Sequence, residues 1–418
     1  MIANRFMLFK KLVLDSFNPL TRGSLAVHLP DGEERVFGGL SRDLRASLTI
    51  HDENFFRRCV LFGPIGFAES YLAGEWDSPD LTKVLAWFVV NADDTSAMRT
   101  RSGRTSLALN VFNFIDRWRH GLRPNSLGKS RDNIREHYDL SNDFFRLWLD
   151  PSMTYSSGYF DPPELTLEEA QEKKYARLCQ KLHLLASDHV LEIGSGWGGF
   201  SIYAAKTYGC RITTITISEQ QYQEAAVRIE QAGLQDLINL QLRDYRTLTG
   251  QYDKIASIEM LEAVGDRYVD GFFAHCEALL KPRGLLGLQA ILCPDDQYPI
   301  LRDGVDFIQK HIFPGSLLMS VGRITKALHK AGRLNLLDYE DMAPFYARTL
   351  QVWRENFESS LEGVRSQGFD EEFIRKWRYY LCYCEAAFGA RHITVAQIVY
   401  SRPNNFSLKS PAYELFEA

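Results

Sequence analysis

From about residue 188, apolar runs alternate with segments that have helical periodicity. The apolar runs are HVLEIG (189–194), CRITTITIS (210–218), LINLQLRD (237–244), DKIASIEM (253–260) and GLLGLQAIL (284–292). The helix-like segments between them cover 198–208, 219–233 and 266–280. This alternation predicts a doubly wound α/β fold, in which helices cover both faces of a mostly parallel sheet.

The N-terminal part of the chain predicts a separate and smaller unit. Three β-prone runs at 24–30, 34–39 and 45–51 are split by turn residues, and a helical pattern follows from Asp52. Gly63-Pro64 is one of two breaks within that helical part. We therefore expect a small α+β domain over 1–94, a helical linker over 95–132 and the α/β domain over 133–418.

The predicted linker is basic. Residues 95–136 contain nine Lys and Arg against three Asp and Glu, with aromatic residues such as Phe112 and Trp118 between the charges. Two interpretations stay open. The segment is either a solvated linker helix or a surface for anionic lipid headgroups, where each basic residue contributes about 1 kcal/mol.

Composition narrows the class of protein. The 418 residues are 45% hydrophobic and 24% charged, with a formal net charge of −5, which indicates a globular protein without a general bias towards nucleic acid. Seven cysteines without a CxxC pair favour reduced thiols in the cytoplasm and no metal site. The amphipathic start has an apolar run of only Phe6 to Phe9, and no stretch approaches the ~18 apolar residues of a spanning helix. Any membrane contact is therefore expected to be peripheral.

A glycine-rich loop, VLEIGSGWGGF (190–200), follows the first predicted strand and opens a helix. Glycine permits tight turns and close approach to a ligand. Gly194, Gly196 and Gly198 have GxGxG spacing, which differs from the dinucleotide GxGxxG pattern. Together with Glu192 before them, they resemble the loop of class I S-adenosylmethionine (SAM) methyltransferases, with a nicotinamide dinucleotide as the weaker alternative.

Polar residues end the next two predicted strands. Ser218 and Gln221 follow the second strand and suit a ribose, and Asp244 and Tyr245 follow the third, where an adenine would lie. The carboxyl ends of parallel strands converge on the ligand crevice of a doubly wound sheet. We therefore predict that these residues and the glycine loop bind one cofactor.

Six segments, in this order, resemble the cyclopropane-fatty-acyl-phospholipid synthases, including the mycolic-acid cyclopropane synthases. They are HYDLSNDFFRLWLDPSMTYSSGYF (137–160), VLEIGSGWGGF (190–200), TISEQQ (216–221), RDYRTL (243–248), EMLEAVG (259–265) and FIQKHIFPG (307–315). The resemblance runs from about Asn133 to Pro403, and the upstream segment resembles the extra N-terminal domain of the bacterial phospholipid enzymes. It implies a class I SAM methyltransferase fold, which is Rossmann-like.

The resemblance also implies a reaction. SAM donates its methyl carbon to the double bond of an unsaturated acyl chain, and the resulting carbocation loses a proton from the new methyl to close a cyclopropane ring. In the family, a bound bicarbonate ion is the base. Such a site needs aromatic faces for the cations, no nearby ammonium and exclusion of water.

Site residues carry over by position. The family's SAM contacts fall on Tyr138, Tyr155, Gly194, Gly196, Gln221, Asp244 and Tyr245. Its bicarbonate contacts fall on Glu262, Tyr346 and the backbone N–H of Ile291. Glu259 is a competing carboxylate three residues before Glu262, without a family counterpart on which to rely.

The sequence departs from familiar members at two site positions. Ser157 stands where the family has a cysteine, and Gln289 stands where it has a histidine. Ser157 can still act through its backbone N–H, and Gln289 keeps a donor but cannot titrate. A weaker or shifted base would allow a hydride shift before proton loss, which would give a methylated or methylenated chain without a ring.

Three functions therefore stay open. We favour a cyclopropane synthase that acts on membrane phospholipid. The alternatives are a C-methyltransferase without ring closure and a non-catalytic lipid-binding relative. The expected setting is the cytoplasm, peripheral to the inner leaflet, with a possible homodimer and no nucleic-acid partner.

Overall fold

The computed structural model describes residues 2–39, 44–92, 140–406 and 408, which form two compact units. The first unit comprises Met1–Arg123, Pro299–Pro314 and Leu350–Ile393, and the second comprises Pro124–Tyr298, Gly315–Thr349 and Thr394–Ala418. The predicted boundaries place residues 133–418 in one domain. In the structure, two segments of that range, Pro299–Pro314 and Leu350–Ile393, belong to the first unit together with the N-terminal residues. The predicted basic linker and Tyr138 lie outside the described residues.

The first unit contains a four-stranded sheet in the order β2-β1-β3-β4. Its strands are β1 (Ser24–His28), β2 (Glu34–Gly38), β3 (Arg45–Ile50) and β4 (Trp76–Asp77). Its helices are α1 (Ile2–Phe17), α2 (Asn54–Leu72), α3 (Leu81–Val90), α12 (Phe307–His311), α15 (Leu361–Ser366) and α16 (Glu371–Gly389). The strands at 24–50 and the break at Gly63-Pro64 are confirmed, because Gly63 has φ +57° and ψ −134° and kinks α2.

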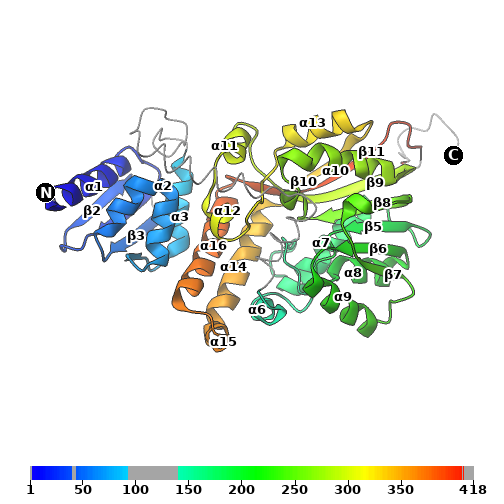
Figure 1. The fold of residues 1–418 in the computed structure, drawn as a ribbon, viewed down its shortest axis with the longest axis horizontal. Helices are drawn as coiled ribbons and strands as arrows, with labels where there is room; N and C mark the ends of the chain where they lie inside the picture. Colours follow the sequence, from blue (N-terminus) through cyan, green and yellow to red (C-terminus); the bar gives the residue numbers. More distant parts are fainter. Residues whose placement is uncertain (1, 40–43, 93–139, 407, 409–418) are drawn as a thin grey trace. The chain divides into compact units, whose positions relative to one another are not determined.

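The second unit contains a seven-stranded sheet in the order β10-β11-β9-β8-β5-β6-β7 (Figure 1). The five predicted strands are β5 (His189–Ile193), β6 (Arg211–Thr216), β7 (Ile238–Leu242), β8 (Tyr252–Ile258) and β9 (Leu280–Leu292). Within the sheet these five strands lie in the order β9-β8-β5-β6-β7, and each pairs in parallel with its neighbours. Two strands not predicted, β10 (Asn335–Asp341) and β11 (Thr394–Ser401), extend the sheet antiparallel. The predicted doubly wound fold is confirmed.

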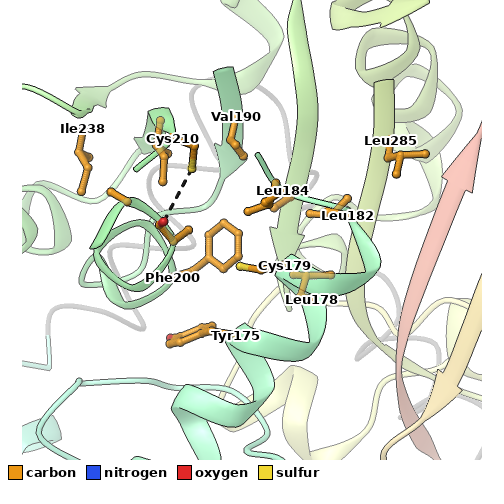
Figure 2. Close-up of a cluster of buried hydrophobic side chains, with 14 of the residues drawn as sticks. Tyr175, Leu178, Cys179, Leu182, Leu184, Val190, Phe200, Cys210, Ile238 and Leu285 are labelled. Carbon is orange, nitrogen blue, oxygen red and sulfur yellow. Dashed lines mark hydrogen bonds between the residues drawn. The ribbon is translucent and has the colours of Figure 1, made fainter. Parts of the chain in front are cut away.

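Helices cover both faces of this sheet. α7 (Leu167–Lys181), α8 (Gly199–Tyr208) and α9 (Glu219–Gln231) lie on one face, and α10 (Asp266–Leu279) and α13 (Val321–Ala331) lie on the other (Figure 1). Figure 2 shows Leu178 of α7, Leu182 directly after α7 and Phe200 of α8 packing towards Val190 of β5. Full burial of each such side chain contributes about 1.5–3 kcal/mol. This core fixes the segment between β5 and α8, which is the glycine loop.

The remaining elements are short or link the two units along the chain. They are α6 (Asn142–Arg146), the 3-10 turns η2 (Tyr245–Thr247) and η3 (Leu261–Ala263), α11 (Tyr298–Asp303) and α14 (Ala343–Ser359). Among the described residues, no helix combines the length and the apolar character needed to cross a bilayer.

Candidate active site

The glycine loop has the geometry of a ligand cradle. Gly194, Gly196 and Gly198 have φ of +95°, +49° and +89°, a region that favours glycine. The backbone N–H groups of Gly194 and Ser195 donate to the Ile215 carbonyl at 3.1 and 2.8 Å, which ties the loop to the end of β6. A Cβ at position 196 would meet no atom within 4 Å, so the loop borders open space at this position. The residues present therefore fit a cofactor such as SAM.

The predicted ribose and adenine residues lie at the carboxyl ends of neighbouring strands. After β6, the Ser218 hydroxyl caps α9 by accepting the Gln221 N–H at 3.3 Å, and the Gln221 side-chain carbonyl accepts the Thr216 hydroxyl at 2.8 Å. After β7, Asp244 pairs with Arg246 at 2.6 Å. Tyr245 packs edge-on against Phe272, and burial raises its pKa to about 12. Their cofactor roles stay a prediction.

Glu192 lies beneath the glycine loop. Its carboxylate accepts hydrogen bonds from the Ser201 hydroxyl of α8 and from the Thr214 hydroxyl of β6, the latter at 2.5 Å. Burial raises the pKa of Glu192 to about 7. The side chain thus joins β5, β6 and α8, and it positions the loop from below.

Aromatic rings gather beside the loop. Tyr155 packs against Phe145 and Trp148, with ring centroids 5.5 and 5.4 Å apart, and Phe145 packs against Trp197 of the loop at 5.2 Å. The Trp197 indole N–H donates to the Asn142 side chain at 2.8 Å. These rings are suited to a cationic sulfonium, because π faces attract cations.

A carboxylate cluster lies at the carboxyl ends of β8 and β9. The Glu259 carboxylate accepts the Ser157 backbone N–H at 2.9 Å and the Gln289 side-chain N–H at 2.8 Å on one oxygen. Its other oxygen accepts the Tyr346 hydroxyl at 2.7 Å. Burial raises the pKa of Glu259. The structure thus brings together three of the predicted site residues, but around Glu259.

Glu262 forms the second half of the cluster. One carboxylate oxygen accepts the Ile291 backbone N–H at 2.5 Å. The other oxygen is buried and has no hydrogen-bond partner in the described part of the chain. Burial and the negative charge of Glu259 raise the pKa of Glu262 to about 8. Glu262 is therefore mostly protonated at neutral pH.

The sequence assigned no role to two residues of this site. Glu259 is named above only as a competing carboxylate, although its place at the end of a parallel strand is a signal for it. Lys174 of α7 is fully buried, donates to the Ser156 hydroxyl at 2.6 Å and lies 4.3 Å from the centre of the Tyr175 ring. Burial lowers the pKa of Lys174, and the charge of Glu259 opposes that shift. The site therefore contains an amine where none was expected.

Comparison with known proteins identifies the family. The profile of the mycolic acid cyclopropane synthetase family matches residues 125–398. Tuberculostearic acid methyltransferase UfaA1 of Mycobacterium tuberculosis is 39% identical over 84% of this chain and 82% of its own length. Cyclopropane-fatty-acyl-phospholipid synthase of Escherichia coli K12 is 34% identical over 85% of this chain and 88% of its own length.

A solved structure agrees with the sequence comparison. Mycolic acid cyclopropane synthase CmaA1, complexed with SAH and CTAB, superposes with a TM-score of 0.61 at 28% identity. The match covers 65% of this chain and 98% of that one. Family, fold and enzyme class are thus as predicted. The chain belongs to the mycolic acid cyclopropane synthetase family and is a SAM-dependent fatty-acyl methyltransferase.

Proposed function

We propose that the enzyme transfers the methyl carbon of SAM to the double bond of an unsaturated acyl chain in membrane phospholipid, and that proton loss from the intermediate closes a cyclopropane ring. The similarity to the Escherichia coli synthase, which extends through both units of this chain, supports a phospholipid substrate. The observation that carries the chemistry is a buried carboxylate pair at the carboxyl ends of β8 and β9, at the same edge of the parallel sheet as the glycine loop that follows β5.

The residues around the proposed reaction suit a cationic intermediate. The SAM sulfonium is the methyl donor, and the role of the chain's own residues is to bind it and to protect the cation from water. Tyr155 and Trp197 belong to the aromatic group beside the loop, and Ser157 and Gln289 are almost fully buried. A dry site protects a carbocation from capture by water.

A separate bicarbonate ion does not fit the residues present. The Ser157 N–H, the Gln289 side-chain N–H and the Tyr346 hydroxyl all donate to Glu259. The Ile291 N–H donates to Glu262. Since the donors expected to hold the anion are occupied by side chains of the protein, we derive no step through bicarbonate.

A second product class has support of its own. The relative named tuberculostearic acid methyltransferase is 39% identical to this chain, against 34% for the Escherichia coli synthase. A hydride shift before proton loss would give a methylated or methylenated chain without a ring. Methyl transfer to an acyl double bond is common to both products.

Product analysis distinguishes the two. The purified protein is incubated with SAM and vesicles of monounsaturated phospholipid, and the released acyl esters are examined by proton NMR. Ring protons at unusually high field without vinyl signals are expected for the cyclopropane product. Vinyl signals on a chain one carbon heavier would assign the enzyme to the second class, and an unchanged acyl chain would refute methyl transfer. Reactions without SAM are the control.

We also propose that the first unit contacts the cytoplasmic surface of the membrane. Met7, Leu8 and Leu12 of α1 are 62%, 53% and 48% exposed, whereas Val13 and Leu14 are buried. Leu8 and Leu12 are one helical turn apart, so they share a face. Such a face is suited to shallow insertion among lipid headgroups. A homodimer stays a prediction.

A further inference from the structure

We propose that Glu259 is the proton acceptor of the reaction, built into the place where the family resemblance predicts an exchangeable bicarbonate ion. The inference rests on the proposed function, which supplies the proton to be removed. Three of the predicted anion donors converge on the Glu259 carboxylate, and the fourth, the Ile291 N–H, donates to Glu262.

Three donors from three different parts of the second unit define the position of the Glu259 carboxylate. They come from the segment before α7, from β9 and from α14, and all three contacts are 2.7–2.9 Å long. Such convergence on both oxygens is the coordination expected of a bound anion. It holds the carboxylate in one orientation, as a group that must meet a reactive methyl requires.

The orientation of the Gln289 amide is also determined by its surroundings. The Gln397 side-chain N–H donates to the Gln289 side-chain carbonyl at 3.2 Å, and the two residues face each other across β9 and β11. Gln397 itself donates to the Lys174 carbonyl at 3.1 Å. Because its side-chain carbonyl is occupied, the Gln289 amide nitrogen faces Glu259, to which it donates at 2.8 Å, and the Ser157 backbone carbonyl, to which it donates at 3.4 Å. A residue that cannot titrate thus remains a permanent donor to the carboxylate.

The backbone at Glu259 supplies independent support. Glu259 has φ +46°, in the left-handed region that residues with a Cβ rarely adopt. The backbone N–H of Glu259 donates to the backbone carbonyl of Gln289 at 2.7 Å, which anchors this conformation. Strained backbone of this kind costs roughly 1–3 kcal/mol and is concentrated at functional sites. A glycine would meet the backbone requirement without strain, so the contacts of the glutamate side chain offset a backbone cost that glycine would not have.

The charges around the cluster make Glu259 the ionised member of the pair. Glu259 accepts three hydrogen bonds, whereas Glu262 accepts one and has a buried oxygen without a described partner. Donors stabilise the charged form of a carboxyl group, so the negative charge resides on Glu259 and the proton on Glu262. The other titratable groups that face Glu259 are Lys174 of α7 and Tyr346 of α14. Because burial raises its pKa, Glu259 is a stronger base than an exposed glutamate.

The proposed step is balanced. When the methyl–sulfur bond of SAM breaks, its electron pair stays on sulfur, and the π electrons of the alkene form the new carbon–carbon bond. The Glu259 carboxylate then accepts one proton from the transferred methyl. The electron pair of that C–H bond closes the ring onto the cationic carbon, or forms a methylene double bond if a hydride has shifted. Glu259 returns the proton to solvent after product leaves.

The test compares the wild type with Glu259→Gln and Glu259→Gly in argon-sparged, bicarbonate-free buffer and in buffer with added sodium bicarbonate. Methyl incorporation into monounsaturated phospholipid vesicles is the readout, and SAM binding by calorimetry and thermal unfolding are controls. General-base catalysis contributes typically ~10²–10⁴-fold. We expect the rate of methyl incorporation by the wild type to be the same with and without bicarbonate. In bicarbonate-free buffer, both variants should have a rate at least ~100-fold below that of the wild type.

The two variants differ in what added bicarbonate can do. Glu259→Gly opens the pocket and relieves the backbone, so we expect it to fold and to regain activity with bicarbonate. Glu259→Gln fills the pocket, so we expect no recovery. The inference is overturned if wild-type activity falls on bicarbonate removal, if Glu259→Gln retains activity within ~10-fold of the wild type, or if folded Glu259→Gly is not rescued.

A binding measurement separates this inference from the proposed function. Line broadening of ¹³C-bicarbonate should show binding to Glu259→Gly and none to the wild type, whatever the substrate. Wild-type protein that binds bicarbonate overturns the inference even if the enzyme is active. If the wild type methylates no acyl chain in any buffer, the proposed function fails, and the bicarbonate result still decides whether Glu259 occupies the anion pocket.

Discussion

Replacement of Tyr346 by phenylalanine tests how the carboxylate cluster is tuned. The Tyr346 hydroxyl donates to Glu259 at 2.7 Å, and the side chain is 5% exposed. The Tyr346→Phe substitution deletes one of three donors and leaves the ring in place. Water has little access to the vacated position, so the Glu259 oxygen loses its partner.

The magnitude follows from the contact that is lost. A hydrogen bond to a charged group contributes ~1.5–3 kcal/mol, which corresponds to ~1–2 pKa units at ~1.4 kcal/mol per unit. A donor stabilises the ionised form, so its removal raises the pKa of Glu259 further. The protonated and inactive fraction therefore grows at neutral and acidic pH. We expect the acidic limb of the rate profile to move ~1–2 units to higher pH, with recovery on the alkaline side.

The assay is the initial rate of methyl transfer from radiolabelled SAM to phospholipid vesicles between pH 5.5 and 9. Tyr159→Phe is a matched control, because Tyr159 is 8% exposed and its hydroxyl donates to another carboxylate, Glu340 of β10, at 3.0 Å. An equal loss of rate at every pH would indicate that Tyr346 only supports the fold. An unshifted acidic limb would refute the reasoning about Glu259.

Three further predictions concern other parts of the enzyme. Gln289→Leu removes the 2.8 Å donor to Glu259 and should lower the rate at pH 7 by ~10–100-fold without changing SAM affinity, measured by calorimetry. Glu192 has its pKa raised to about 7, so the folded state binds its proton more tightly and stability falls as pH rises from about 5 to 7. Glu192→Gln should remove up to about 3 kcal/mol of that fall in pH-dependent chemical denaturation, whereas a parallel fall in both proteins would contradict the prediction. Leu8→Asp combined with Leu12→Asp should weaken binding to anionic vesicles at least ~10-fold. Val227→Asp, which changes an exposed aliphatic side chain on α9 of the second unit, should leave binding unchanged. Equal binding by the wild type and both variants would exclude α1 as the contact.

Most of the central sheet could be predicted from the sequence because its strands are buried. β5, β6 and β8 are short apolar runs, and β9 contains one at 284–292, which is the pattern of strands covered on both faces. The partly exposed start of β9, before Gly284, was not predicted. β10 was missed because it is a largely exposed edge strand with acidic residues, which have low strand propensity. β11 was missed although it is buried, because its partner β9 lies about 100 residues earlier and no local pattern specifies that pairing.

The site was only partly predicted for similar reasons, because local propensity and distant strand pairing also decide the position of its carboxylate. The family resemblance located Ser157, Gln289 and Tyr346, but it did not indicate that the anion at their centre is a side chain of the protein. Glu259 meets these donors from a left-handed backbone conformation, and a sequence pattern does not reveal a positive φ at a residue other than glycine. The amide that holds it depends in turn on the register of β11, which places Gln397 opposite Gln289. A change in that register would free the Gln289 carbonyl and release the carboxylate. The unpredicted strand and the unpredicted proton acceptor are therefore parts of one arrangement.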